Sequence, residues 1–248
     1  MKIPFACLLA DRSAFMWTHR IPADSSASDL VNLALTSDYA WKDVAAELLK
    51  RPPDTAAAGI LIHTFQEGRA PAWLTAFLLG CLRDRSGYTV VRDILWSTPG
   101  YSGESYAGVA MARIAGAAAR DDLLDAMQNA PTRGSREGAA YGLGELADDS
   151  LAPLLLEAAR AGRIRSDNAA TNIASSSSVE PLLREWLATD DSFKQAVALY
   201  AAFSLSATST RLRNVELARA VNRALKTGVG PVSPDIKKML AERIAPLL

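Results

Sequence analysis

The chain contains the stretch Ser135-Arg136-Glu137-Gly138-Ala139-Ala140-Tyr141-Gly142-Leu143-Gly144-Glu145-Leu146-Ala147-Asp148-Asp149. Within it, Ala139, Leu143 and Leu146 are spaced i, i+4, i+7, so they lie along one stripe of a helix. A second apolar segment, residues 151–162, follows at once. The stretch therefore predicts two short helices in succession, which form a helical hairpin.

The same apolar spacing returns on both sides of this hairpin. Successive stripes lie between 27 and 32 residues apart, and a fixed period of this length indicates a repeated supersecondary unit. The recurrences are Ala107, Met111 and Ile114; Ala169, Ile173 and Ser176; and Ala196, Tyr200 and Phe203.

Helix-breaking and capping residues separate the expected helices. Pro52-Pro53 ends one helix, Asp54 can N-cap the next, and Gly68 closes it before Pro71 starts another. Asp148-Asp149, Ser177-Ser178 and Asp190-Asp191 supply side-chain oxygens for later helix starts. The sequence predicts a helix over 27–36, a terminal helix over 234–247, and hairpins over 39–68, 70–98, 103–130, 134–162, 165–189 and 191–227.

The composition favours an all-α protein. Ala contributes 45 and Leu 32 of the 248 residues, and both are strong helix formers, while aromatic residues make up only 7%. Hydrophobic residues at 49% and charged residues at 22% are typical of a globular chain. No apolar run reaches the roughly 18 residues that a membrane span requires.

Residues 135–162 resemble the HEAT repeat, especially its short bacterial form, which is shared with the phycobilin lyases. The residues that match that pattern are Glu137, Ala139, Ala140, Leu143, Gly144, Leu146 and Asp148. The hairpin at 103–130 has Ala112 in place of the glycine, and the hairpin at 165–189 has Ser175–Ser178 where a hydrophobic residue and an acidic turn belong.

The resemblance implies a right-handed α-solenoid of about six HEAT-like hairpins in a single domain over 1–248. Each hairpin would bury the apolar faces that its neighbours leave open. Residues 1–26 would form an irregular or capping N-terminus, 27–227 the helical hairpins, and 228–248 a C-terminal cap.

Motifs for catalysis or cofactor binding are absent from the sequence. Gly142-Leu143-Gly144 imitates a dinucleotide fingerprint, but that fingerprint needs a preceding strand, and these glycines follow a helical stripe. They are expected to permit close helix packing instead. No Gly-x-Ser-x-Gly elbow surrounds the serines at 175–178. We therefore expect neither an enzyme nor a cofactor.

Metal and disulfide sites are not expected either. The chain has only His19 and His63, without further ligands at helical spacing, and His63 is expected to be a hydrogen-bonded core or groove histidine. Cys7 and Cys81 are too far apart for a zinc motif and too few for a disulfide framework.

Charge is distributed unevenly along the chain. The net charge is zero, but the segment from Lys194 onward has nine basic and three acidic residues, which leaves 18 basic and 24 acidic residues before it. Opposed poles can guide docking, although a solvated terminal helix would also account for the basic excess. Two basic clusters stand out, Arg219-Arg223-Lys226 at helical spacing and Arg160-Arg163-Arg165.

Acidic and aromatic residues complete the set of candidate partner-binding residues. Asp121, Asp122 and Asp125 favour a helix start electrostatically and could also form an acidic patch. Trp96 and Trp186 lie near the ends of second helices, which line the concave side of HEAT arrays, and Trp is enriched at interface hot spots. The other tryptophans are expected in the core. The candidates are Trp96, Asp121, Asp122, Asp125, Arg160, Arg163, Trp186, Arg219, Arg223 and Lys226.

The expected function is the binding of another protein, without catalysis, by a monomer or homodimer. The resemblance suggests an adaptor or inhibitor, for example a bacterial immunity protein that neutralises a cognate toxin through its concave face. One alternative is a nucleic-acid-binding protein similar to HEAT-like DNA glycosylases, against which a pI near 6.7 argues because phosphate contacts supply most non-specific DNA affinity. The other is a chaperone or lyase of the phycobilin-lyase type.

The start of the chain bears on its location. Residues 1–10 superficially resemble a signal peptide, but their apolar stretch is short and no small-x-small cleavage site follows. A cytoplasmic protein without membrane association is therefore expected, with a cleaved leader at residues 1–10 as the alternative.

Overall fold

The computed structural model describes residues 21–22, 24–37, 40–97, 103–176, 178–207, 214–228 and 232–248. These residues form helices and connecting turns and contain no strand, so the expected all-helical fold is confirmed for them. The chain divides into two compact units, residues 1–142 and 143–248, and the boundary falls inside helix α9. The single domain expected over 1–248 stays a prediction.

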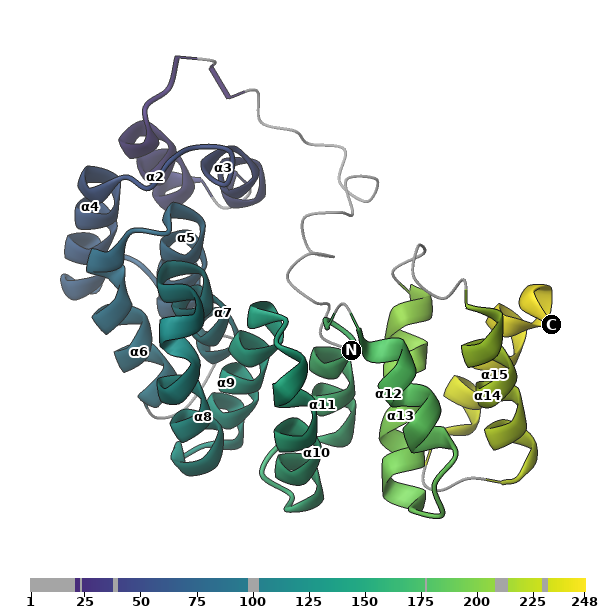
Figure 1. Ribbon diagram of the computed structural model, residues 1–248. Helices are drawn as coiled ribbons and strands as arrows, with labels where there is room; N and C mark the ends of the chain where they lie inside the picture. Colours follow the sequence, from purple (N-terminus) through teal and green to yellow (C-terminus); the bar gives the residue numbers. More distant parts are fainter. Residues whose placement is uncertain are drawn as a thin grey trace. The chain divides into compact units, whose positions relative to one another are not determined.

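In the first unit, alternate helices pack side by side (Figure 1). Helix α5 contacts both α3 and α7, while α6 lies against α5 and α7. The helices are α2 (Ala27–Thr36), α3 (Trp41–Leu48), α4 (Thr55–Gln66), α5 (Ala72–Leu82), α6 (Tyr88–Trp96), α7 (Gly103–Ala115), α8 (Arg120–Asn129) and the first part of α9 (Arg133–Leu146), with short 3-10 turns η1 (Arg85–Gly87) and η2 (Gly116–Ala119).

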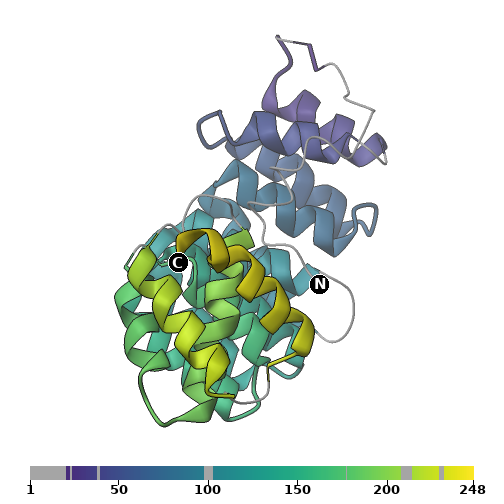
Figure 2. The same cartoon turned by 90° about the vertical axis from the view of Figure 1, so that its right-hand side faces the viewer.

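The second unit repeats this packing of alternate helices. Helix α11 contacts α13, α12 contacts α14, and α15 lies beside both α13 and α14 (Figure 2). The elements are η3 (Asp149–Leu151), α10 (Ala152–Arg160), α11 (Ser166–Ile173), α12 (Val179–Leu187), α13 (Ser192–Ala207), α14 (Val215–Lys226), α15 (Pro234–Ile244) and η4 (Ala245–Leu247).

Most helix ends follow the local signals in the sequence. The Asp54 carboxylate accepts from the backbone N–H of Ala57 at 2.8 Å and caps α4, and Gly68 follows α4 with φ +71°. Asp191 caps α13 by accepting from the backbone N–H of Phe193 and Lys194 at 3.0 and 3.1 Å. Predicted and observed helices therefore agree closely, including the helix over 27–36.

Two caps differ from expectation. Pro71 precedes α5 in an extended conformation and is its N-cap rather than part of its first turn. Ser178 stands at the N-cap of α12 but makes no side-chain capping bond. The hydroxyls of Ser176 and Ser178 donate instead to the Asp149 carboxylate, which has a lowered pKa because of these two bonds. The hydroxyl of Ser178 is therefore bonded to Asp149 instead of capping α12.

Glycine brings helices α7 and α9 into backbone contact. A Cβ added at Gly108 would lie 1.9 Å from the carbonyl oxygen of Gly138, and one at Gly142 would lie 2.4 Å from that of Gly108. Only residues without a Cβ fit such an approach. The glycines that imitate a dinucleotide fingerprint therefore serve helix packing: Gly144, the other glycine of that motif, faces the side chain of Asn172.

None of the described helices is long and apolar enough to cross a membrane. The expectations for the signal-like start, Cys7, Trp17 and His19 concern residues outside the described part of the chain.

Candidate functional site

A hollow of about 270 Å³ opens on the surface of the first unit. Helix α6 contributes Arg92, Asp93 and Trp96 to its lining, and helix α8 contributes Asp122 and Asp125. Three of the residues expected to bind a partner, Trp96, Asp122 and Asp125, therefore come together, although Trp96 precedes the two aspartates by 26 and 29 residues in sequence. We call this group of five residues the acidic hollow.

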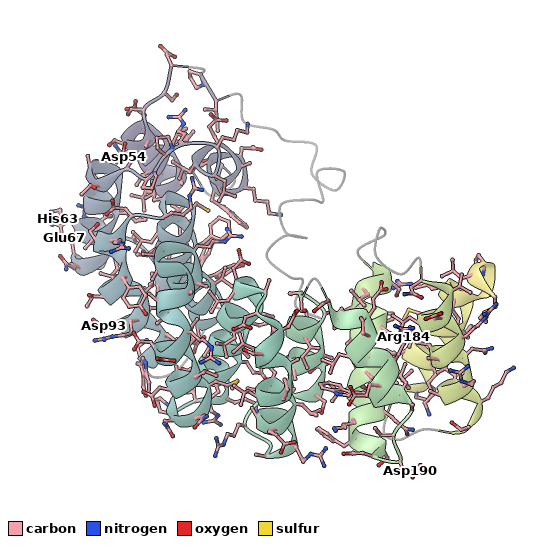
Figure 3. The ribbon with its side chains drawn as sticks, viewed as in Figure 1. Asp54, His63, Glu67, Asp93, Arg184 and Asp190 are labelled. Atoms are coloured by element: carbon pink, nitrogen blue, oxygen red, sulfur yellow. The ribbon has the colours of Figure 1, made fainter. Side chains whose placement is uncertain are left out.

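Helical spacing brings the lining residues to one side of each helix. Asp93 and Trp96 are spaced i, i+3 on α6, and Asp122 and Asp125 have the same spacing on α8. The opposite sides of these helices are anchored in the core by residues such as Leu95 and Leu123, both fully buried. Figure 3 shows Asp93 on the outer side of the unit. The hollow thus lies between the exposed faces of two helices whose buried side chains hold them in the core.

A hydrogen bond joins the two helices at the edge of the hollow. The Tyr88 hydroxyl on α6 donates to the Asp122 carboxylate on α8 at 2.8 Å. Burial, together with this bond to a carboxylate, raises the pKa of Tyr88, so the hydroxyl stays protonated and remains a donor. Asp125 accepts from the side-chain amide of Asn129 at 2.6 Å. Both α8 carboxylates are therefore held in place by neutral donors.

Negative charge in the hollow is not balanced by the chain itself. Asp93, Asp122 and Asp125 form no ion pair with any described residue, and Arg92 is the single cation in the lining. Three carboxylates and one guanidinium leave a formal charge of −2 around the half-buried Trp96 side chain. An aromatic ring beside carboxylates attracts a cation through both its π face and the ionic groups.

The remaining acidic and aromatic candidates lie elsewhere. Asp121 does not line the hollow; its side chain is exposed and lies 3.5 Å from a guanidinium nitrogen of Arg120. Trp186 is only 3% exposed, so its ring belongs to the core of the second unit. Of the two tryptophans singled out in the sequence, only Trp96 reaches the surface of a hollow.

The two basic clusters differ in how they are paired. Arg160 lies 2.6 Å from Asp191 and 3.4 Å from Glu157, and its guanidinium sits over the Phe193 ring at 5.3 Å. Arg165 pairs with Asp167 at 3.3 Å, and Arg163 is exposed nearby. In contrast, the exposed side chains of Arg219, Arg223 and Lys226 on α14 form no ion pair or hydrogen bond with a described residue.

His63 corrects an expectation from the sequence. Its side chain is 70% exposed, and its Nε2 lies 3.3 Å from Glu67 on the outer side of α4 (Figure 3). The expected core or groove position is wrong because α4 buries Leu61 and Thr64, which leaves His63 on the opposite side of the helix. The apolar residues next to His63 in sequence had suggested a buried position, although they lie on other sides of the helix.

An aromatic cluster in the first unit was missed by the sequence analysis. Trp41 packs edge-to-face on Trp73 and on Phe77, with ring centroids 5.5 and 5.2 Å apart, and Tyr106 meets Phe77 at 5.4 Å. Only Phe77 is fully buried. The expectation that Trp41 and Trp73 lie in the core thus holds only partly, since both residues are half-buried.

Cys81 is buried, and burial raises the pKa of its thiol to about 12. Among the described residues, no three His, Cys, Asp or Glu side chains gather into a group that could hold a metal ion.

No family model matches the sequence, and neither the curated proteins nor the solved structures contain a significant match to it.

Proposed function

We propose that this protein is a non-catalytic, protein-binding HEAT-like α-solenoid that acts as an adaptor or inhibitor, for example an immunity protein that neutralises a toxin. The all-helical fold and the packing of alternate helices in both units support the repeat architecture. The acidic hollow is the observation that carries the proposed binding function.

The size and lining of the hollow suit a side chain of another protein. Small-molecule pockets usually enclose about 300–1,000 Å³ and are mostly apolar. This hollow, at about 270 Å³, is smaller and is lined by four charged residues and one tryptophan. A guanidinium could lie against Trp96 while it donates to the carboxylates of α8, since arginine combines stacking with bidentate hydrogen bonding. The proposed partner therefore presents an arginine, or another basic side chain, to unit one.

The test starts from a partner isolated with the full chain from its native host. The dissociation constant of the complex with this partner is then measured for the unchanged protein and for the double variant Asp93→Asn/Asp125→Asn. The double variant removes two charges while keeping the side-chain shapes. Asp93 and Asp125 form no ion pair within the described chain, so the loss of their charges opposite a cation of the partner should weaken binding by roughly tenfold or more.

A matched control removes two exposed carboxylates far from the hollow in sequence. Asp190→Asn/Asp235→Asn makes the same charge change in the second unit and should leave the dissociation constant unchanged. Equal weakening by both double variants, or the absence of any stable partner, would refute the proposal. Salt-dependent retention of the protein on duplex DNA would favour the nucleic-acid alternative instead.

A further inference from the structure

The outer face of α14 exposes a row of three cations, Arg219, Arg223 and Lys226, which we call the α14 row. The opposite face of the helix is buried through Leu217, Val221 and other apolar residues, and α14 packs against α12 and α15. The row is therefore fixed on a helix whose orientation is set by its apolar face.

The α14 row differs from four other described arginines of its unit, which all have partners within the chain. Arg160 and Arg165 pair with carboxylates, and Arg184 on α12 pairs with Glu216 at the start of α14. Arg243 donates to Ser206 and lies over the Phe203 ring. The three cations of the row have no such partner among the described residues.

The helix dipole explains only part of this arrangement. Cations in the last turn stabilise a helix, and Arg223 and Lys226 occupy the last turn of α14. Arg219 lies one turn from the N-terminus of the helix, at the positive end of its dipole, and gains nothing from that effect. A contact with an external anion accounts for all three positions.

The row continues into an exposed apolar residue. Val215, 40% exposed, precedes Arg219 by one helical turn, and at about 100° per residue it shares an arc of about 80° with the α14 row. From Val215 to Lys226 the face extends for about 16 Å, or three helical turns. Its pattern is one apolar contact followed by three positive charges.

We infer that the α14 row binds an acidic segment of a partner protein. Such a segment would place carboxylates opposite the three cations and an apolar side chain on Val215. A nucleic acid fits less well, because residues 143–248 contain 13 basic and 12 acidic residues. Exposed carboxylates include Glu185 on the neighbouring helix α12 and Asp190 in the turn that follows it. A continuous phosphate backbone would meet these carboxylates, whereas a short acidic segment would not.

This surface does not depend on the acidic hollow, which lies in the other unit and has the opposite charge. A partner could use either surface alone, so each is tested with its own probe.

The test uses the full chain and a fluorescein-labelled helical peptide of about three turns, with glutamates spaced i, i+4, i+7 and one leucine a turn away. Fluorescence anisotropy at low ionic strength gives its dissociation constant. The double variant Arg219→Glu/Arg223→Glu should weaken peptide binding by roughly tenfold or more, because it places like charges opposite each other. A peptide with glutamine in place of glutamate should bind the unchanged protein at least as weakly as the glutamate peptide binds the double variant.

The matched control is Arg85→Glu/Arg133→Glu, which changes the net charge equally at two exposed arginines of the first unit. It should alter peptide binding by less than about twofold, because these two arginines belong to the other unit and are not part of the α14 row. Far-ultraviolet circular dichroism checks that both variants keep their helicity. Equal weakening in both variants, equal binding of the glutamine peptide, or tighter binding of duplex DNA through the same arginines would overturn the inference.

Discussion

The backbone of Gly138 lies directly against the backbone carbonyl of Glu104. A Cβ atom added at position 138 would lie 2.2 Å from the carbonyl oxygen and 2.6 Å from the carbonyl carbon. Both neighbouring atoms belong to the main chain of α7, so they cannot turn aside as a side chain would.

Gly138→Ala should therefore lower the free energy of unfolding. Alanine gains about 1 kcal/mol over glycine in helix propensity, but overpacking against a backbone costs about 1–3 kcal/mol or more. We expect a net loss of at least about 1 kcal/mol by urea denaturation. Gly59→Ala on α4 is the control, because nothing lies within 4 Å of its added Cβ, and it should stabilise the protein. If both substitutions stabilise, α7 and α9 are not in backbone contact.

Tyr88→Phe should loosen the contact between α6 and α8 at the acidic hollow. It removes the hydroxyl that donates to Asp122 at 2.8 Å and keeps the ring. Since both side chains are partly exposed, the loss should be about 1 kcal/mol or less. A double-mutant cycle with Asp122→Asn isolates the bond, and additive effects of the two substitutions would show that it contributes no stability.

Asp191→Asn should destabilise the protein near neutral pH and have no effect in acid. The hydrogen bond from Arg160, with those from the backbone N–H of Lys194 and Phe193, lowers the pKa of Asp191 from its usual 3.8. A carboxylate whose pKa is lower in the folded than in the unfolded state stabilises the folded protein at pH values above the unfolded pKa. This stabilisation is lost as the pH falls through the folded-state pKa. Urea denaturation should show a difference between the two proteins at pH 7 that disappears at about pH 2. An equal difference in stability at pH 7 and pH 2 would mean that the negative charge of Asp191 does not contribute to stability.

Cys81 should not react with thiol reagents while the protein is folded. With the pKa of the thiol near 12, only about one molecule in ten thousand carries the thiolate at pH 8. The measurement uses Cys7→Ser, so that Cys81 is the sole cysteine, and compares labelling by a chromogenic disulfide in buffer and in urea. Rapid labelling in buffer would show that the buried position opens readily.

The helices could be predicted from the sequence because their ends depend on neighbouring residues. Asp54 and Gly68 lie beside the ends that they define and act on backbone atoms a few residues away. Ser178 shows the limit of such local reasoning. Its hydroxyl bonds to Asp149, 29 residues away, and this long-range contact replaced the expected cap.

The candidate site was only partly predictable for the same reason. Trp96 and Trp186 look alike in sequence, yet one lines a hollow and the other is buried, because burial depends on which helices pack against them. Asp93 looked like any charged residue on a solvated helix face. Its part in the site becomes visible only when α8 brings Asp122 beside α6.

The glycine contact between α7 and α9 has a consequence for how this protein can change. Because that seam is made by main-chain atoms, its geometry does not depend on the side chains that α6 and α8 display on their outer faces. Positions 92, 93, 96, 122 and 125 can therefore be randomised together in a library while the seam holds the scaffold. New binding specificities should be obtainable from this small set of positions, provided that 108, 138 and 142 remain glycine.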